Sequence, residues 1–153
     1  PVKMLTMIDE FPRQCLVIHP ARSIRSDRVL DILQHLADCT GAPAYIRSDN
    51  GSEFIAHIIQ DWCHLTDVQT LYIEPGSPWQ NGFIESFHSR FRDECLNQEI
   101  FFSIAETQVV VEDFRRQYNG QRPHSSLGYK TPDEFARRLK DKPAEIRQSS
   151  HPK

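Results

Sequence analysis

Two acidic residues occupy positions from which they could hold a metal ion. Asp49 follows a short predicted strand and precedes a glycine turn, at the edge where open α/β sheets place ligands. Glu85 lies on a predicted helix, directly after a loop rich in Gly and Pro. If the carboxylates converge, they suit Mg²⁺ or Mn²⁺ and a phosphodiester substrate, because Mg²⁺ binds through one or two carboxylates together with substrate phosphates. A simpler alternative for Asp49 is a turn aspartate that caps the next helix.

The helix that carries Glu85 separates into two faces at helical spacing. Its apolar positions are Ile84, Phe87, Phe91 and Cys95. Its polar positions are Glu85, His88, Ser89 and Arg92. From that polar face Arg92 could donate charge-assisted hydrogen bonds to a phosphate. The alternative is a solvated face whose charges have no further role.

Alternating strand and helix patterns precede this helix. Residues 2–8 and 13–18 are β-prone runs around a turn, which predicts a hairpin. Ser26 is a candidate cap for a helix that Gly41-Ala42-Pro43 ends. A strand over 44–48, one amphipathic helix over 54–65 and a strand over 68–73 follow. The order β-β-α-β-α-β predicts an α/β fold.

Two further helices are predicted after this α/β segment. One begins near Phe83, and the other begins at Ser103, where Ser103 and Glu106 fit a capping box. Beyond Pro143 few apolar residues remain, so residues 141–153 are expected to form a disordered tail.

Composition excludes several classes of protein. With 153 residues, 39% hydrophobic and 25% charged, the chain is expected to form one soluble domain over residues 1–140. No apolar run approaches the ~18 residues of a membrane span. The four cysteines are widely spaced, which favours reduced thiols and the cytoplasm, although a disulfide stays possible. The net charge of −3 implies that a nucleic-acid partner would be held by local contacts, with help from another domain or subunit.

Four blocks together resemble the integrase core of bacterial insertion-sequence transposases, which are relatives of retroviral integrases. The blocks are Arg47-Ser48-Asp49-Asn50-Gly51-Ser52-Glu53-Phe54, residues 75–87, residues 91–96 and residues 118–132 with Tyr-Asn-x-x-Arg-Pro-His. The 35 residues between Asp49 and Glu85 match the second half of the family's Asp, Asp-35-Glu pattern, and Arg92 matches its following basic residue. The resemblance covers nearly all of residues 2–138.

The resemblance implies an RNase H-like mixed sheet flanked by helices. It also implies that Asp49 and Glu85 are catalytic metal ligands for two Mg²⁺ or Mn²⁺ ions, which would activate water or a 3′-hydroxyl for attack on DNA. The implied partners are transposon ends, target DNA, further copies of the chain and an upstream DNA-binding region, in the bacterial cytoplasm at the nucleoid. No membrane partner is implied.

The start of the chain departs from the family pattern. Such cores take their first catalytic aspartate from a first strand, whereas this sequence begins inside the second, so Asp9 matches a hairpin-turn aspartate. We expect the first strand and a third metal ligand to be missing, and therefore weak metal binding and little strand transfer by this chain alone. Two strand edges should then be unpaired and favour dimerisation.

Secondary assignments follow from the same resemblance. Ser89, His88, Trp79, Gln80 and Asn81 are candidate DNA contacts, with Trp79 equally compatible with a position over the core. Arg122 and His124 are expected to brace the C-terminal helix rather than bind phosphate. Two alternatives are an RNase H-like nuclease acting on RNA–DNA hybrids and a non-catalytic DNA-binding or assembly remnant of an inactivated element.

Overall fold

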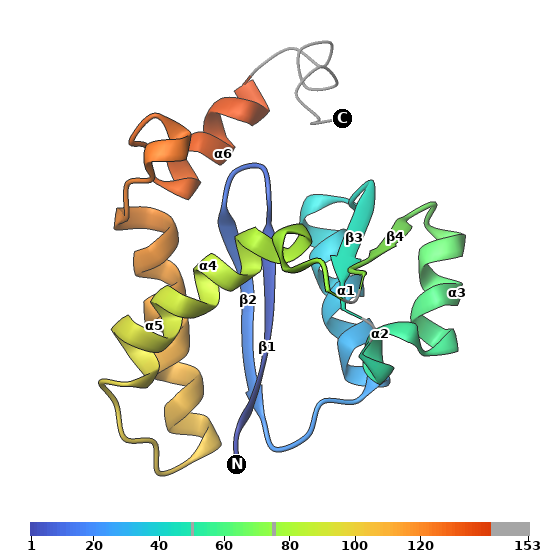
Figure 1. The fold of residues 1–153 in the computed structure, drawn as a ribbon, viewed down its shortest axis with the longest axis horizontal. Coiled ribbons are helices and arrows are strands. Elements are labelled where there is room, and N and C mark those ends of the chain that lie inside the picture. Colours follow the sequence, from blue (N-terminus) through green and yellow to red (C-terminus); the bar gives the residue numbers. More distant parts are fainter. Residues whose placement is uncertain (50, 75, 142–153) are drawn as a thin grey trace. The chain divides into compact units, whose positions relative to one another are not determined.

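A computed structural model describes residues 1–49, 51–74 and 76–141 as two compact units (Figure 1). The first unit contains residues 1–3 and 20–89, and the second contains residues 4–19 and the chain from Arg90 onward. The predicted tail after Asp141 lies outside the described residues.

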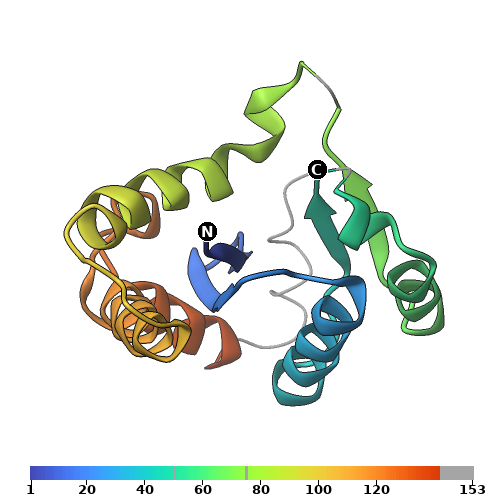
Figure 2. The same ribbon diagram turned by 90° about the horizontal axis from the view of Figure 1, so that it is seen from below.

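The first unit contains a parallel strand pair and helices. Strands β3 (Tyr45–Ser48) and β4 (Gln69–Tyr72) pair in parallel, with Tyr45 opposite Gln69. Parallel neighbours need a crossover, which α2 (Ser52–Ile55) and α3 (His57–Leu65) supply. Helix α1 (Ser26–Thr40) packs beside α3 (Figure 2). Buried apolar residues of this unit include Val29, Leu33, Ile59, Trp62, Cys63, Val68 and Phe87.

Two local expectations for this unit were wrong. The predicted helix over 54–65 is broken at Ala56, whose extended ψ of 144° separates α2 from α3. Ile55, in α2, and Leu65, at the end of α3, are both exposed. Ser26 is not the cap of α1, because the capping position is Arg25 and no side chain there accepts a hydrogen bond.

The second unit contains the predicted hairpin, β1 (Lys3–Asp9) and β2 (Gln14–Ala21), and two helices. Helices α5 (Ile104–Gln121) and α6 (Pro132–Asp141) pack against each other (Figures 1 and 2). The capping prediction for α5 is confirmed, since the Glu106 N–H donates to the Ser103 hydroxyl at 3.0 Å. Helix α6 starts with a capping box that the sequence analysis missed, in which Thr131 and Glu134 each accept the other's backbone N–H.

Side-chain amides hold the helices of the second unit to its hairpin. Asn119 of α5 accepts the Cys15 N–H and donates to the Cys15 carbonyl, both at 2.7 Å. Gln14 donates to the Asp133 carboxylate of α6 at 2.8 Å. The rings of Phe11 and Phe135 meet edge to face 5.5 Å apart. The N–H and the carbonyl of Cys15, in the second strand of the hairpin, are therefore both satisfied by one helix side chain.

The strands form two separate two-stranded sheets in the part of the chain that the structure describes. There β1 pairs only with β2, and β3 only with β4.

Each of the four cysteines is a free thiol. Cys15, Cys63 and Cys95 are buried and Cys39 is exposed. Burial raises the pKa of the Cys15 thiol to about 12, which keeps it protonated at neutral pH. Among the described residues, no helix is both long and apolar enough to span a bilayer.

Candidate catalytic site

Asp49 is exposed at the end of β3 and forms a local turn. Its Oδ1 accepts the Gly51 N–H at 2.9 Å, so Asp49 makes the turn contact of the alternative, but no side chain caps α2. A Cβ on Gly51 would lie only 2.9 Å from that Oδ1. Since Gly51 has a φ of −58°, glycine is needed for this close approach and not for a left-handed backbone. The turn leaves Asp49 Oδ2 without a hydrogen bond among the described residues.

A second carboxylate, Glu53, lies against the same glycine. The position of a Cβ on Gly51 is 3.2 Å from Glu53 Oε1, close to the Asp49 oxygen. The Ser52 hydroxyl donates to Glu53 Oε2 at 3.5 Å. Glu53 was not among the predicted site residues, although its place four residues after Asp49 was a usable signal. The end of β3 therefore carries two neighbouring acids.

Glu85 lies in the first turn of α4 (Gly82–Phe91), in the same unit as Asp49. The predicted faces of this helix are confirmed, because Phe87, Phe91 and Cys95 are at most 4% exposed while Glu85 faces solvent. In the described part of the chain no hydrogen bond or ion pair joins Asp49 to Glu85. Nor do three His, Cys, Asp or Glu side chains there form a group that could hold a metal ion.

The remaining polar positions of α4 have different surroundings. Ser89 is exposed and His88 is half-buried. Arg92 is exposed and begins a π-helical turn, Arg92–Leu96, closed by the Asn97 N–H donating to the Arg92 carbonyl at 2.9 Å. Such turns often occur at functional sites. Arg92 belongs to the second unit, so its position relative to Asp49 and Glu85 stays a prediction.

The loop before α4 contains a short 3₁₀ helix, Pro78–Asn81, that displays an aromatic side chain. Trp79 is 73% exposed, which excludes the alternative that it covers the core. Gln80 closes the loop, because its side-chain oxygen accepts the Glu74 N–H at 2.9 Å. The side chain of Asn81 lies outside what the structure describes.

Asp9 ends β1 in the second unit, at the hairpin turn where the sequence analysis placed it. Burial raises the pKa of its carboxyl, and a hydrogen bond from the backbone of Phe11 opposes that shift. The carboxyl is thus engaged with the turn that follows its strand.

The C-terminal motif acts as a brace, as expected. Arg122 forms an ion pair with Glu94, and its guanidinium carbon lies 5.9 Å from the centre of the Tyr118 ring. The ring of His124 meets Tyr118 edge to face at 5.2 Å. The His124 N–H donates to the Lys130 carbonyl at 3.0 Å, within an isolated β-bridge. These contacts fix the connection between α5 and α6.

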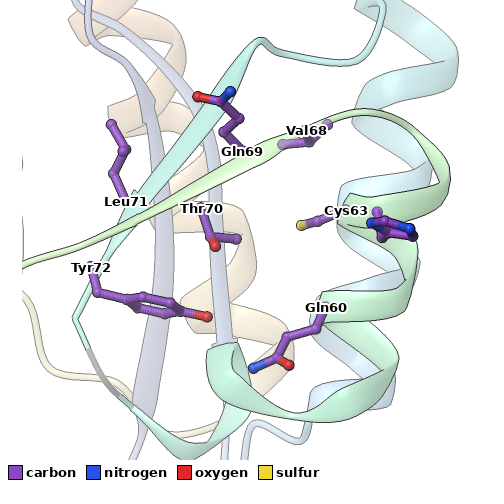
Figure 3. Close-up of a pocket in the computed structure, with 8 residues that line it drawn as sticks. Gln60, Cys63, Val68, Gln69, Thr70, Leu71 and Tyr72 are labelled. Atoms are coloured by element: carbon purple, nitrogen blue, oxygen red, sulfur yellow. The ribbon is translucent and has the colours of Figure 1, made fainter.

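A cavity of about 560 Å³ lies between α3 and β4 of the first unit (Figure 3). Gln60, Cys63, Thr70 and Tyr72 are among its lining residues. The Tyr72 hydroxyl is buried and has no hydrogen-bond partner among the described residues. None of the predicted site residues lines this cavity.

Comparisons with known proteins agree on one family. Two family models, both described as integrase core domain, match residues 1–78 and 66–132. An uncharacterised 39.2 kDa protein of insertion element IS476 from Xanthomonas euvesicatoria is 42% identical over 135 residues, which are 88% of this chain and 39% of that protein. An uncharacterised 31.7 kDa protein of element IS407 from Burkholderia multivorans is 39% identical, with 88% and 49% covered. The chain thus spans less than half the length of these two relatives.

Solved structures show the same fold. The catalytic core domain of bovine immunodeficiency virus (BIV) integrase superposes with a TM-score of 0.69 and 17% identity, over 92% of this chain and 97% of that one. A chain of the simian T-cell lymphotropic virus intasome superposes with a TM-score of 0.66 and 15% identity, over 88% and 51%. The predicted RNase H-like α/β fold is thereby confirmed.

Proposed function

Because this chain belongs to the integrase core domain family, we propose that it is the catalytic core of a transposase that cleaves and joins DNA by metal-dependent transesterification. The observation that carries the proposal is the exposure of both motif acids, Asp49 and Glu85, within one compact unit. Their separation of 35 residues supports the assignment.

The donor set fits a hard divalent cation held jointly by protein and substrate. Asp49 and Glu85 offer carboxylate oxygens. Among the described residues, no group of three His, Cys, Asp or Glu side chains that could hold a metal ion is found. Mg²⁺ commonly keeps water and substrate phosphates beside one or two carboxylates. When two such ions are bound, they stabilise the attacking and leaving oxygens of an in-line displacement. We therefore expect the chain alone to bind metal weakly and to cleave slowly.

The protein's own residues orient and hold the substrate. The Gly51 N–H fixes Asp49 Oδ1 and leaves the other oxygen available for a cation. Trp79 is exposed enough to stack on an unpaired base. Arg92, Ser89 and His88 would contact DNA phosphates from α4 and the turn after it.

The proposed partners are DNA and other protein chains. With a net charge of −3, the chain has no overall electrostatic attraction to DNA. We propose that further copies and an upstream DNA-binding region of the same transposase supply the remaining contacts, in the bacterial cytoplasm at the nucleoid. The likeness to a chain of a viral intasome supports an oligomeric assembly.

A second candidate function is a non-catalytic DNA-binding remnant. It is favoured by one observation, the lack of a three-residue metal-binding group in the described chain. An RNase H-like nuclease is a weaker alternative, because the match to the integrase core family extends to residue 132.

Calorimetric titration with Mg²⁺ and Mn²⁺ tests the metal site. We expect dissociation constants of order millimolar, lost in Asp49→Asn and Glu85→Gln and kept in Asp38→Asn, an exposed acid of α1. Metal binding unchanged in both site variants would refute the assignment.

A nicking assay on supercoiled plasmid in Mn²⁺ separates the candidate functions. A catalytic core should nick slowly, and Glu85→Gln should abolish nicking while DNA binding persists. No nicking above background by a chain that binds DNA would favour the remnant. Preferential cleavage of RNA–DNA hybrids would favour the nuclease.

A further inference from the structure

One residue of the turn between α5 and α6 has a strained backbone. Tyr129 has a φ of 61°, in the left-handed region that residues other than Gly, Asn and Asp rarely occupy. Gly128 before it also has a positive φ, of 64°, but a glycine adopts such a φ without strain. The Tyr129 N–H donates to the His124 carbonyl at 2.8 Å, and His124 pairs with Lys130 in an isolated β-bridge. The turn therefore holds a tyrosine in a conformation that glycine would adopt more easily.

The Tyr129 side chain contributes little to the stability of the fold. The residue is 76% exposed, and in the described part of the chain its ring stacks on no other aromatic ring. Left-handed backbone costs a bulky residue free energy, and an exposed ring recovers little of that cost through burial. Strain that the fold does not repay is typical of ligand-binding positions. Tyr129 is therefore a candidate contact for a ligand.

The rest of the turn is polar and carries a positive charge beside the ring. The exposed residues that precede Tyr129 are Ser125, Ser126 and Gly128. No apolar patch therefore extends from the ring along the turn, which disfavours a protein partner. Lys130 follows Tyr129, and its ammonium lies 3.4 Å from the position of a Cβ on Gly128. No ion pair of this ammonium is found among the described residues. An accessible aromatic ring and an available cation thus occupy adjacent residues.

We propose that Tyr129 stacks on an unpaired base of single-stranded DNA and that Lys130 contacts a neighbouring phosphate. The proposal rests on the proposed function, because it takes DNA as the partner, and it adds a contact in the unit that lacks Asp49 and Glu85. Aromatic rings beside positive charges commonly bind single strands, since every base has a face on which a ring can stack. The hydrogen bonds of the turn fix its backbone before DNA binds, which reduces the entropy lost on binding.

Fluorescence anisotropy with a labelled oligothymidylate roughly 12 nucleotides long, in EDTA, tests the stacking contact. We expect Tyr129→Gly to weaken binding about tenfold, whereas Tyr129→Phe, which keeps the ring, should bind within about twofold of wild type. Urea unfolding should show no loss of stability in Tyr129→Gly, because glycine adopts the left-handed backbone without strain. A residue with a purely structural role would not lose binding while the fold keeps its stability.

Two control variants match the two properties of Tyr129. Asp67→Gly relieves the same strain at an exposed residue with a φ of 58°, and Phe102→Ala removes another exposed ring of the second unit. Both should change binding less than about twofold. Lys130→Gln should reduce the slope of log K against log salt by about 0.7. Lys3→Gln, which removes the charge of an exposed lysine outside the turn, should leave the slope unchanged.

Four outcomes would overturn the contact. Equal binding of oligothymidylate by Tyr129→Gly and Phe102→Ala would refute the stacking while the proposed function stands. An equally large loss on a blunt duplex would also refute it, because a paired base offers no free face to the ring. If Tyr129→Gly keeps DNA binding but sediments more as a monomer than wild type, the ring contacts a second copy instead. If the wild-type chain binds no oligothymidylate, the contact fails, whereas plasmid nicking in Mn²⁺ still decides the proposed function.

Discussion

Asp49 and Glu85 face solvent in the first unit, whereas Asn119 and His124 are buried in the second. The two acids have few protein contacts, since Asp49 accepts one local N–H and no partner of Glu85 is found among the described residues. Asn119 instead satisfies both peptide groups of Cys15. Both pairs belong to blocks of the same family resemblance, yet one pair is available to a ligand and the other holds the fold together.

This contrast separates residues that are available to bind a ligand from residues that stabilise the fold. A carboxylate that binds a cation jointly with a substrate has to be exposed, because the cation and the substrate must both reach it. The Asn119 amide instead bonds the peptide groups of a strand. Its hydrogen bonds are stronger when buried, because water does not compete for them. Variants of Asn119 and His124 should therefore affect stability, and variants that disturb Asp49 or Glu85 should affect metal binding.

The largest expected effect on stability is that of Asn119→Ala. It would leave the buried N–H and carbonyl of Cys15 without the Asn119 side chain, at a cost of about 3 kcal/mol in the free energy of unfolding. Urea denaturation measures this change. Asn97→Ala, at an exposed position, should cost less than about 1 kcal/mol. Equal losses in the two variants would contradict the special role of Asn119.

Acidification should destabilise the second unit through His124. Its pKa is about 4 in the folded chain and about 6.5 when unfolded, so the unfolded chain binds more protons between these values. The stability contributed by neutral His124 is complete above about pH 6.5 and is lost as pH falls toward 4, by about 2 kcal/mol after solvent screening. Urea unfolding at several pH values should show this slope in wild type. It should be absent in His124→Gln and retained in His35→Gln, which changes an exposed histidine of α1.

Gly51→Ala should weaken metal binding in the first unit without lowering its stability. The new Cβ would meet Asp49 Oδ1 at 2.9 Å and displace the carboxylate. We expect metal affinity to fall by about tenfold, which corresponds to about 1.4 kcal/mol, with little change in the unfolding free energy. Gly82→Ala is the control, because a Cβ there meets nothing within 4 Å and the backbone is helical. An unchanged metal affinity in Gly51→Ala would argue against Asp49 as a ligand.

The smallest expected effect on stability is that of Trp79→Ala. A side chain that is 73% exposed contributes little to folding, so thermal unfolding should change by less than about 0.5 kcal/mol. Binding of single-stranded DNA should weaken about fivefold, because a stacked base is lost. Phe102→Ala, which truncates an exposed aromatic residue outside the proposed site, is the control. Equal DNA binding by the two variants would remove Trp79 from the proposed interface.

Local signals predicted the elements that position the candidate site. The 3.6-residue period correctly assigned Phe87 and Phe91 to the core and left Glu85 exposed. The capping box at Ser103 correctly predicted the N-terminal end of α5. The break at Ala56 escaped prediction, because neither Gly nor Pro marks it and the apolar period runs through it.

Residue types and short spacings were sufficient to predict the family, the candidate metal-binding acids and most helix and strand positions, because all of these depend on local sequence. The packing of distant segments, by contrast, brings Asn119 to the peptide groups of Cys15, 104 residues away, and Gln14 to the Asp133 carboxylate, 119 residues away. Such pairs form because distant segments pack together and bury their polar groups, so each group must find a partner that no local spacing specifies.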